Sequence, residues 1–372
     1  MMRQDYEKIL AKCFEKVNHM NDRLDGFPHI TRKSAWLTNR DGHWTGGFWI
    51  GLLWLERIMV SDSGMDEMIK SWAMKLRCRM DDTSTHDQGF IFGPSCVLGY
   101  RVTGDEAYLP LIHAGAENLI KQYIPASGLI RAWGEYGYAG ISIVDTIMNI
   151  PLLWISGELL DDPTRKELCL SVGRRIQKYA VREDYSTYHV VRWDKNYIIY
   201  GDTHQGFSAD SCWSRGQAWA LYGFSNMYRY TGETEFLEEA IKIADYYWEH
   251  LNDDLMPAWD FNFRNDSSQP IDAAASSIAC AGMALISEMC RVRKDTKAAN
   301  LWGKRADRII AAETNICLFD DMDKYGIIRH ATVDFPRKSG VDESAMYGDY
   351  YFAEALYRRI NIDTPKVTSL LY

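Results

Sequence analysis

Tyr100-Arg-Val-Thr-Gly-Asp-Glu-Ala-Tyr-Leu109 recurs further along the chain as Tyr228-Arg-Tyr-Thr-Gly-Glu-Thr-Glu-Phe-Leu237. In both copies an apolar helix is expected to stop at the glycine, and an acidic first turn opens the next helix. Ser156-Gly-Glu158, before Pro163, is a looser copy, and Arg293-Lys-Asp295 is a degenerate one. A turn that recurs in this way predicts stacked helical hairpins rather than two unrelated domains.

Helical periodicity recurs through most of the 372 residues, whereas the alternation of a half-buried β-strand is rare. Twelve helices are expected, and they begin near Tyr6, Trp44, Met65, Gly89, Glu106, Ile141, Pro163, Ser214, Glu233, Asp272, Thr296 and Glu343. The even-numbered helices are more apolar and richer in Ala, Gly and Ser, which suits a crowded inner ring, while the odd-numbered ones carry a polar face. Six hairpins closed into a ring therefore predict an all-α fold, an (α/α)6 barrel.

One stretch departs from the helical pattern. Tyr185 to Asp202 alternates between apolar and polar residues and predicts a minor β-hairpin in the loops outside the barrel. No linker rich in Pro, Gly or Ser divides the chain, so residues 1–372 are expected to form a single domain.

The composition restricts the partners of the protein. A net charge of −9 and the lack of a Lys/Arg stripe argue against a nucleic-acid surface. Residues 1–20 lack the apolar core of a signal peptide, and no run of 18 apolar residues is present, so no membrane span is predicted. Eight scattered cysteines with no Cys-x-x-Cys pair are typical of reduced core thiols in a cytoplasmic protein. The 13 tryptophans and 22 tyrosines fit a cleft that faces carbohydrate.

The stretch Gly201-Asp-Thr-His-Gln-Gly-Phe-Ser-Ala-Asp-Ser-Cys-Trp-Ser-Arg-Gly-Gln-Ala-Trp219 concentrates unusual side chains in one loop and the helix that follows. Ser214 and Gln217 have the spacing of a capping box, which predicts that the helix begins at Ser214. Arg215 and Trp219 then lie one turn apart on the same face. Aromatic surfaces beside an arginine fork and amide or imidazole donors suit a sugar that carries a carboxylate.

Polar or aromatic residues mark the starts of all six predicted inner helices. These residues are Trp44, Asp87, Asp145, Arg215, Asp272 and Glu343. In an α/α barrel all six starts lie at the same end, so six loops converge on one mouth, and the helix N-termini there favour a bound carboxylate. The spacing predicts a pocket with aromatic walls, two carboxylates and an arginine.

The acidic candidates also have structural interpretations. Asp87, in His86-Asp-Gln-Gly89, could be a helix cap, and Asp272 is most simply a cap. Asp145 stands in Ile143-Val-Asp-Thr-Ile147, an apolar helix start where a charge is costly unless it is paired or functional. A site is therefore favoured over a structural role for Asp145.

Motifs for metals and cofactors are missing from the sequence. The chain has no His-Glu-x-x-His, no Cys/His cluster and no Asp-rich calcium loop, so no metal is expected. It has no Gly-x-Ser-x-Gly elbow, phosphate-binding loop or dinucleotide fingerprint, so no cofactor is expected either. Taken singly, His189 and His204 are more simply hydrogen-bonding core or loop residues than catalysts.

Eight runs, in order along nearly the whole chain, carry a family resemblance. They are Trp44-Thr-Gly-Gly-Phe-Trp49, His86-Asp-Gln-Gly-Phe90, Ala132-Trp-Gly134, Asp145 with Asn149-Ile-Pro-Leu-Leu153, Thr203-His-Gln-Gly206, Trp213-Ser-Arg-Gly-Gln-Ala-Trp219, Asp272-Ala-Ala-Ala-Ser-Ser277 and Gly348-Asp-Tyr-Tyr-Phe352. The sequence resembles the unsaturated glucuronyl hydrolases of glycoside hydrolase family 88. Family 105 shares the barrel, but its members are less similar to this chain in the loop around Thr203 to Trp219.

The resemblance implies an (α/α)6 barrel that removes a 4,5-unsaturated uronic acid from the non-reducing end of glycosaminoglycan-type oligosaccharides left by polysaccharide lyases. It aligns Asp145 with the family's general acid/base and Asp87 with its second essential carboxylate. The residues that correspond to those around the unsaturated ring are Trp44, His189, Gln205, Arg215 and Trp219, and those toward the next sugar are Trp133, His204 and Trp213. The region Arg337-Lys-Ser-Gly-Val-Asp342 matches no known sulfate-binding pattern.

The expected reaction is hydration of the C4=C5 enol ether. One carboxyl, Asp145, can donate a proton to C4 if apolar burial and the charge of Asp87 keep it protonated. Three other functions remain open at this point: a family 105-like unsaturated rhamnogalacturonyl hydrolase, a sugar 2-epimerase, and a non-catalytic oligosaccharide-binding protein. The chain is expected to act as a monomer or homodimer.

Overall fold

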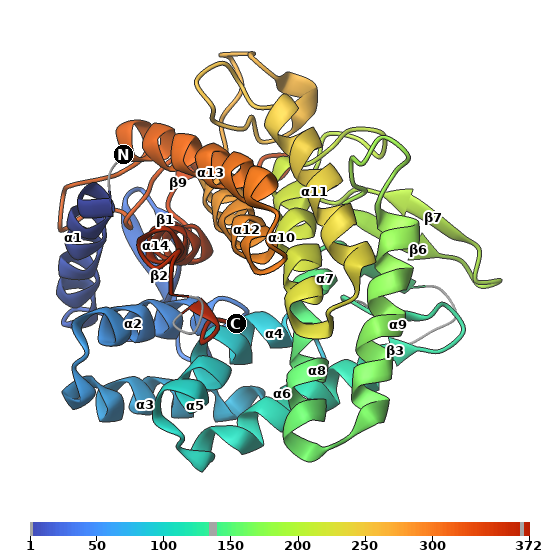
Figure 1. The fold of residues 1–372 in the computed structure, drawn as a ribbon, viewed down its shortest axis with the longest axis horizontal. Helices are drawn as coiled ribbons and strands as arrows, with labels where there is room; N and C mark the ends of the chain where they lie inside the picture. The colour runs from blue at the N-terminus through green and yellow to red at the C-terminus, as the bar shows by residue number, and fades with distance from the viewer. Residues whose placement is uncertain (1–2, 134–139, 365–367) are drawn as a thin grey trace.

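The computed structural model describes residues 3–133, 140–364 and 368–372, and this part of the chain is mainly helical (Figure 1). Its α-helices are α1 (Arg3–Asn21), α2 (Gly46–Val60), α3 (Asp66–Lys75), α4 (Gln88–Phe92), α5 (Leu98–Thr103), α6 (Leu109–Gln122), α7 (Thr146–Asn149), α8 (Pro151–Leu160), α9 (Pro163–Ala180), α10 (Ser214–Thr231), α11 (Thr234–Glu249), α12 (Ala273–Val292), α13 (Thr296–Ile316) and α14 (Met346–Ile360). A π-helix, Gly93–Val97, separates α4 from α5, and Ile150 alone separates α7 from α8. Counting each of these pairs as one bent helix gives the twelve predicted helices.

The helices form two concentric rings. Neighbouring helices of the inner ring contact one another in the order α2, α4–α5, α7–α8, α10, α12 and α14, and α14 returns to α2. Each inner helix is backed by an outer one from the set α1, α3, α6, α9, α11 and α13 (Figure 1). The predicted (α/α)6 barrel is confirmed, and so is the assignment of the even-numbered helices to the inner ring.

The recurring turn ends helices as expected at its two clearest copies. Gly104 and Gly232 adopt left-handed φ angles of 72° and 74°. Their amides donate to the carbonyls of Tyr100 and Tyr228 at 2.7 and 2.8 Å, which satisfies groups left open at a helix end. The looser copy differs from these two, because Gly157 lies inside α8, which ends at Leu160 with Asp161 in the left-handed cap position.

In the described part of the chain, nine strands form four small sheets in the loops. They are β1 (Phe27–Arg32) with β2 (Ala35–Asn39), β3 (Tyr123–Ile124) with β4 (Leu129–Ile130), β5 (Gly140–Ile143) with β6 (Val190–Trp193) and β7 (Ile199–Asp202), and β8 (Ala331–Asp334) with β9 (Ser339–Glu343). All the pairings are antiparallel. The hairpin predicted within residues 185–202 is confirmed as β6 and β7.

Two predicted helix starts are strands instead. Ile141 lies in β5, which pairs with β6, and the helix begins only at Thr146. A short, mostly apolar stretch such as Ile141 to Val144 fits a buried strand as well as a helix, so its period cannot separate the two. Glu343 ends β9, and its carboxylate accepts hydrogen bonds from the Thr31 hydroxyl and the Lys33 amide. Glu343 therefore links β9 to β1, and it is not part of the candidate site.

Small residues let the inner helices approach closely. A Cβ on Gly47 of α2 would overlap the backbone carbonyl of Phe90, and one on Gly223 of α10 would overlap Ile147. Among the described residues, α12 has the length and mean hydropathy, 1.5, of a membrane-crossing helix, but 94% of that window is buried inside the protein. It contacts α10, α13 and α14 and is a core helix of the barrel.

The cysteines follow the prediction with one exception. All eight are free, and seven of them are buried. Cys78 is exposed, so it is not the core thiol that its scattered spacing predicted.

Candidate active site

The two aspartates stand at the starts of two adjoining short helices. Asp87 immediately precedes α4, and Asp145 immediately precedes α7. Asn149 joins the helices, because its side-chain amide donates to the Asp145 carbonyl at 3.1 Å and its oxygen accepts from the Phe90 amide at 2.9 Å. The structure thus brings together two carboxylates that lie 58 positions apart in the sequence.

Asp145 is held in the protonated form by its surroundings. Its side chain is 9% exposed, and Oδ1 has no hydrogen-bond partner among the described residues. Burial is the largest cause that raises the pKa of Asp145, and the charge of Asp87 adds to it. The Arg215 guanidinium acts in the opposite direction, and the resulting pKa is about 8. A carboxyl that keeps its proton at neutral pH is suited to general acid catalysis.

Asp87 does not act as a helix cap, although it occupies the cap position. Its side chain accepts no hydrogen bond from the α4 backbone. Instead one carboxylate oxygen accepts from the Thr85 hydroxyl, and the other lies 3.5 Å from Nε2 of His86. The side chain is 16% exposed, so Asp87 is the more solvated of the two carboxylates.

The two ring nitrogens of His189 differ in their contacts. Its Nδ1 accepts hydrogen bonds from the backbone amides of Gln205 and His204 at 3.0 and 3.3 Å. Burial holds the pKa of His189 well below its ordinary value, so the ring is neutral and its proton is on Nε2. That Nε2 is buried without a partner among the described residues. It is a free donor, and the ring lies 4.3 Å from that of Trp213.

The loop residues beside His189 form a connected group. The His204 ring lies 5.3 Å from Trp133. Arg337 donates to the His204 carbonyl at 2.9 Å and approaches Nδ1 of the same ring at 3.1 Å. The Gln205 amide donates to the Val333 carbonyl at 2.7 Å, which ties this loop to β8. Gly134, the last residue of the run that contains Trp133, lies outside the described residues.

Arg215 is buried and already bonded within the protein. One terminal nitrogen donates to Asp272 and, at 2.7 Å, to the Thr332 carbonyl, while the other donates to the Val333 carbonyl. Asp272 also accepts from the amides of Ala274 and Ala275, so its predicted cap is confirmed. The guanidinium still acts on Asp145 electrostatically, as the pKa of that carboxyl shows.

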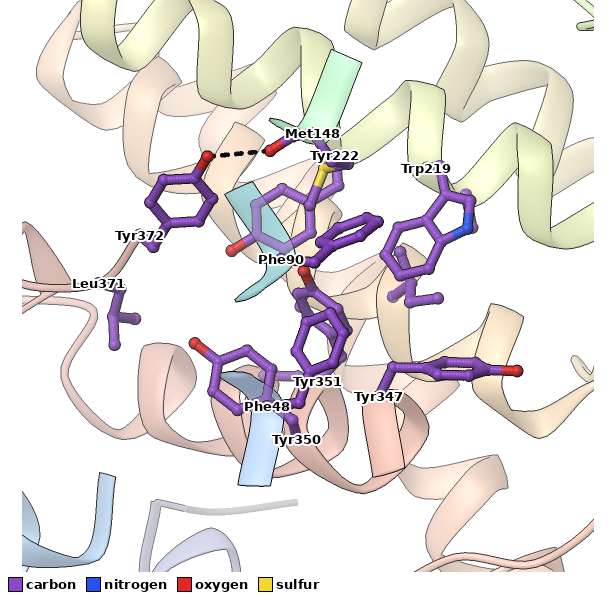
Figure 2. Close-up of a cluster of buried hydrophobic side chains, with 14 of the residues drawn as sticks. Phe48, Phe90, Met148, Trp219, Tyr222, Tyr347, Tyr350, Tyr351, Leu371 and Tyr372 are labelled. Atoms are coloured by element: carbon purple, nitrogen blue, oxygen red, sulfur yellow. Dashed lines mark hydrogen bonds between the residues drawn. The ribbon is translucent and has the colours of Figure 1, made fainter. Parts of the chain in front are cut away.

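Aromatic rings surround this polar group. Trp44 stacks on Tyr347 with their centroids 5.0 Å apart. Trp219 is 1% exposed, and its ring centroid lies 4.8 Å from that of Phe90. Figure 2 shows Trp219 among Phe90, Tyr347 and Tyr351, within a buried cluster. Trp44 is the more accessible wall, whereas Trp219 forms part of the core beneath it.

The sequence profile described as Glycosyl Hydrolase Family 88 matches residues 3–258. This chain belongs to that family.

Curated relatives cover most of this family 88 hydrolase. An unsaturated glucuronyl hydrolase of Bacillus sp. (strain GL1) is 31% identical over 90% of this chain and 91% of its own length. An unsaturated chondroitin disaccharide hydrolase of Streptococcus agalactiae serotype III is 30% identical over 95% of this chain and 89% of its own.

Solved structures agree with this family assignment. The Bacillus sp. GL1 unsaturated glucuronyl hydrolase superposes with a TM-score of 0.88 at 29% identity, covering 99% of this chain and 98% of that one. An unsaturated glucuronyl hydrolase specific for heparin superposes with a TM-score of 0.87 at 27% identity, covering 97% of both chains.

The helix start at Ser214 is confirmed, but the capping box is wrong. Trp213 occupies the cap position, and no side chain caps α10. The Ser214 hydroxyl donates to the Trp259 carbonyl, and the Gln217 amide donates to the carbonyls of Tyr185 and Ile243. Both side chains are drawn into bonds with other segments, which local spacing does not reveal.

Two site residues were missed by the sequence analysis. The Nε2 of His86 and the hydroxyl of Tyr347 are buried without hydrogen-bond partners among the described residues. The Tyr347 ring stacks on Trp44 and also lies 5.3 Å from the Arg215 guanidinium. The sequence offered one signal for each residue: His86 directly precedes Asp87, and Tyr347 directly precedes the family run that begins at Gly348.

Within the described ranges, no group of three or more His, Cys, Asp or Glu side chains could hold a metal ion. Exhaustive chelation is expected to leave turnover unchanged, because the described residues offer no ligand set for a chelator to empty. Activity assays before and after prolonged incubation with chelator check this. Loss of activity that one specific metal restores would contradict it.

If Arg215 pairs with the uronate carboxylate of the substrate, Arg215→Lys is expected to raise KM on the order of 10- to 100-fold. A hydrogen bond to a charged group contributes about 1.5–3 kcal/mol. One ammonium cannot reproduce a planar fork that serves Asp272 and two β8 carbonyls at once. Steady-state kinetics and thermal unfolding should be measured together. A near-normal KM with reduced stability would assign Arg215 a structural role alone.

Proposed function

We propose that this family 88 enzyme removes a 4,5-unsaturated uronic acid from the non-reducing end of lyase-generated, glycosaminoglycan-type oligosaccharides. The observation that carries the proposal is Asp145, a buried carboxyl whose pKa is raised to about 8 beside a second carboxylate. The relatives' activities support the same substrate class, since they are unsaturated glucuronyl and unsaturated chondroitin disaccharide hydrolases. A solved structure that contains dGlcA-Glc-Rha-Glc superposes on this chain with a TM-score of 0.89 at 28% identity, covering 98% of both chains.

Protonation of the enol ether begins the proposed reaction. Asp145 donates its proton to C4, and positive charge develops at C5 and the ring oxygen. The Asp87 carboxylate stabilises this charge. Water then attacks C5 and gives its proton to the Asp145 carboxylate, which restores the acid for the next cycle.

Bond rearrangement in the product releases the leaving sugar. The C5 hemiketal opens to a ketone, which leaves C1 as a hemiacetal, and this hemiacetal expels the next sugar. No displacement at C1 by a carboxylate is needed, so the separation of the two carboxylates does not report retention or inversion.

Substrate contacts are proposed for His189, which has a free donor, for the residues bonded near it, and for the aromatic rings around them. The free Nε2 of His189 is positioned to donate to the unsaturated sugar, with Gln205 and Arg215 in the same group of residues. Trp44 and Trp219 are proposed to flank the unsaturated ring, and Trp133, His204 and Trp213 to line the path toward the next sugar. Flat apolar faces with polar donors between them suit a pyranose ring.

The conjugated C4=C5 uronate absorbs in the ultraviolet, and steady loss of this band is expected when the enzyme meets a panel of lyase-generated disaccharides. In deuterated water the released keto acid should carry deuterium at C4, since the first proton goes to carbon. Binding without any loss of absorbance, across the whole panel, would favour an oligosaccharide-binding protein. A product without label at C4, with later exchange excluded, would overturn the hydration mechanism.

We further propose that the enzyme works in a reducing compartment, as a monomer or homodimer. Its eight cysteines are free, and seven are buried, which suits the cytoplasm. Cell fractionation tests the first statement, and light scattering of the purified protein tests the second.

A further inference from the structure

The side chain of Tyr372 is buried against the inner helices that follow the two aspartates (Figure 2). It is 4% exposed, although the segment that carries it belongs to neither ring of the barrel. Arg101, in the last turn of α5, holds this segment by donating to the carbonyls of Leu370 and Leu371 at 3.3 and 2.8 Å. The tyrosine is therefore placed by specific contacts.

The Tyr372 hydroxyl is bonded at the junction of α7 and α8. It donates to the carbonyls of Asn149 and Met148 at 3.1 and 3.3 Å, and Figure 2 draws the bond to Met148. The helical ladder is irregular at this point, because the Leu153 amide bonds to Ile150 rather than to Asn149 four positions back. A side chain inserted at such a break fixes the bend between two helical segments.

The Tyr372 ring also lies against α4 and the π-helix that follows it. A Cβ on Gly93 would overlap the ring, and one on Gly89 would overlap both the Tyr372 hydroxyl and the Asn149 backbone. Only glycine at these two positions allows so close an approach. One side chain therefore contacts the helix that follows Asp87 and the helix that follows Asp145.

Asn149 connects this contact to the site. Its backbone carbonyl accepts from Tyr372, while its side chain bonds to the Asp145 carbonyl and to the Phe90 amide of α4. Both helices are short, α4 with five residues and α7 with four. Helices of one turn have little rigidity of their own, so their relative position depends on such cross-links.

We propose that Tyr372 is a positioning residue, whose hydroxyl, inserted at the α7–α8 junction, fixes the separation of Asp87 and Asp145. The proposal rests on the catalytic roles proposed above for these two aspartates. Tyr372 does not touch the substrate in this account and acts through α4, α7 and Asn149.

Tyr372→Phe removes the hydroxyl and keeps the ring. We expect kcat to fall about 10- to 100-fold with KM little changed, because small misplacements of catalytic groups have effects of this size. Three groups near Asp145 interact with it electrostatically. The charge of Asp87, just before α4, raises the pKa of Asp145, and Arg215 of α10 lowers it. Asp145 in turn raises the pKa of Tyr347 of α14. If Asp87 moves away, its repulsion weakens, so the pKa of Asp145 falls and the alkaline limb of the pH profile moves to lower pH.

Tyr6→Phe is the matched control. Tyr6 is equally buried, and its hydroxyl donates to Asp307 at 2.8 Å between α1 and α13, outside the candidate site. It should lower thermal stability and leave kcat and the pH profile unchanged. If Tyr372→Phe behaves in the same way as this control, Tyr372 is structural only and the proposal is overturned.

Infrared difference spectroscopy of the Asp145 carboxyl, assigned with Asp145→Asn, needs no substrate and separates the two proposals. A lower Asp145 pKa in Tyr372→Phe supports positioning even if the wild type consumes no unsaturated oligosaccharide, an outcome that would overturn only the proposed function. An unchanged Asp145 pKa in a folded Tyr372→Phe protein overturns the positioning role, whatever the activity.

Discussion

Asp145→Asn is expected to lower kcat by a factor on the order of 10²–10⁴ while the protein still folds and binds substrate. The amide has nearly the shape of the carboxyl but no proton acidic enough for C4. Asp145 has no hydrogen-bond partner at Oδ1 among the described residues, so the substitution breaks no hydrogen bond to a described residue at that oxygen. Loss of ultraviolet absorbance measures turnover, and calorimetry with an unsaturated disaccharide measures binding.

The same variant has an expected effect on stability that checks its folding. The pKa of Asp145 in the folded protein, about 8, is raised above the ordinary value of 3.8. Stability from this group is therefore fully present below about pH 4 and is lost as the pH rises through 8, because the folded state resists ionisation. Asp145→Asn removes this loss and should unfold at a higher temperature than the wild type at alkaline pH. A variant with normal turnover would exclude Asp145 as the proton donor.

The barrel was predictable because its signals are local and repeated. Gly104 and Gly232 end helices through their own backbone geometry, and each turn leads from an inner helix to an outer one. The run at Ile141 failed for the opposite reason. Its partner is β6, some fifty positions away, and nothing in a stretch as short as Ile141 to Val144 distinguishes a strand from a helix start.

The acidic part of the site was predictable on similar grounds. A charge in an apolar helix start is costly, and this cost distinguishes Asp145 in the sequence alone. The partners of Arg215 could not be predicted in the same way. Its guanidinium bonds to Asp272 and to two carbonyls of β8, which lie 57, 117 and 118 positions along the chain. The contact of Tyr372 with Met148 spans 224 positions and carries no sequence motif.

Asp87→Asn is expected to lower kcat/KM on the order of 10²–10³-fold, because it removes a preorganised charge that stabilises the cationic transition state. It should also change the pH dependence of whatever activity remains. Asp145 acts as an acid, so activity is lost as the pH rises through its pKa, and the wild-type alkaline limb should lie near pH 8. The charge of Asp87 is one cause that raises this pKa, so its removal should move the alkaline limb to lower pH.

The matched control for this prediction is Asp162→Asn, the same substitution at the start of the outer helix α9. Asp162 caps that helix by accepting from the Thr164 amide, and it should show wild-type turnover and an unchanged pH profile. The profile of kcat/KM is the appropriate measurement, because it reports groups of the free enzyme. If the alkaline limb of Asp87→Asn stays at the wild-type pH, the charge of Asp87 does not hold the proton on Asp145. Burial alone would then have to account for that proton, and Asp87 would keep only its role at the transition state.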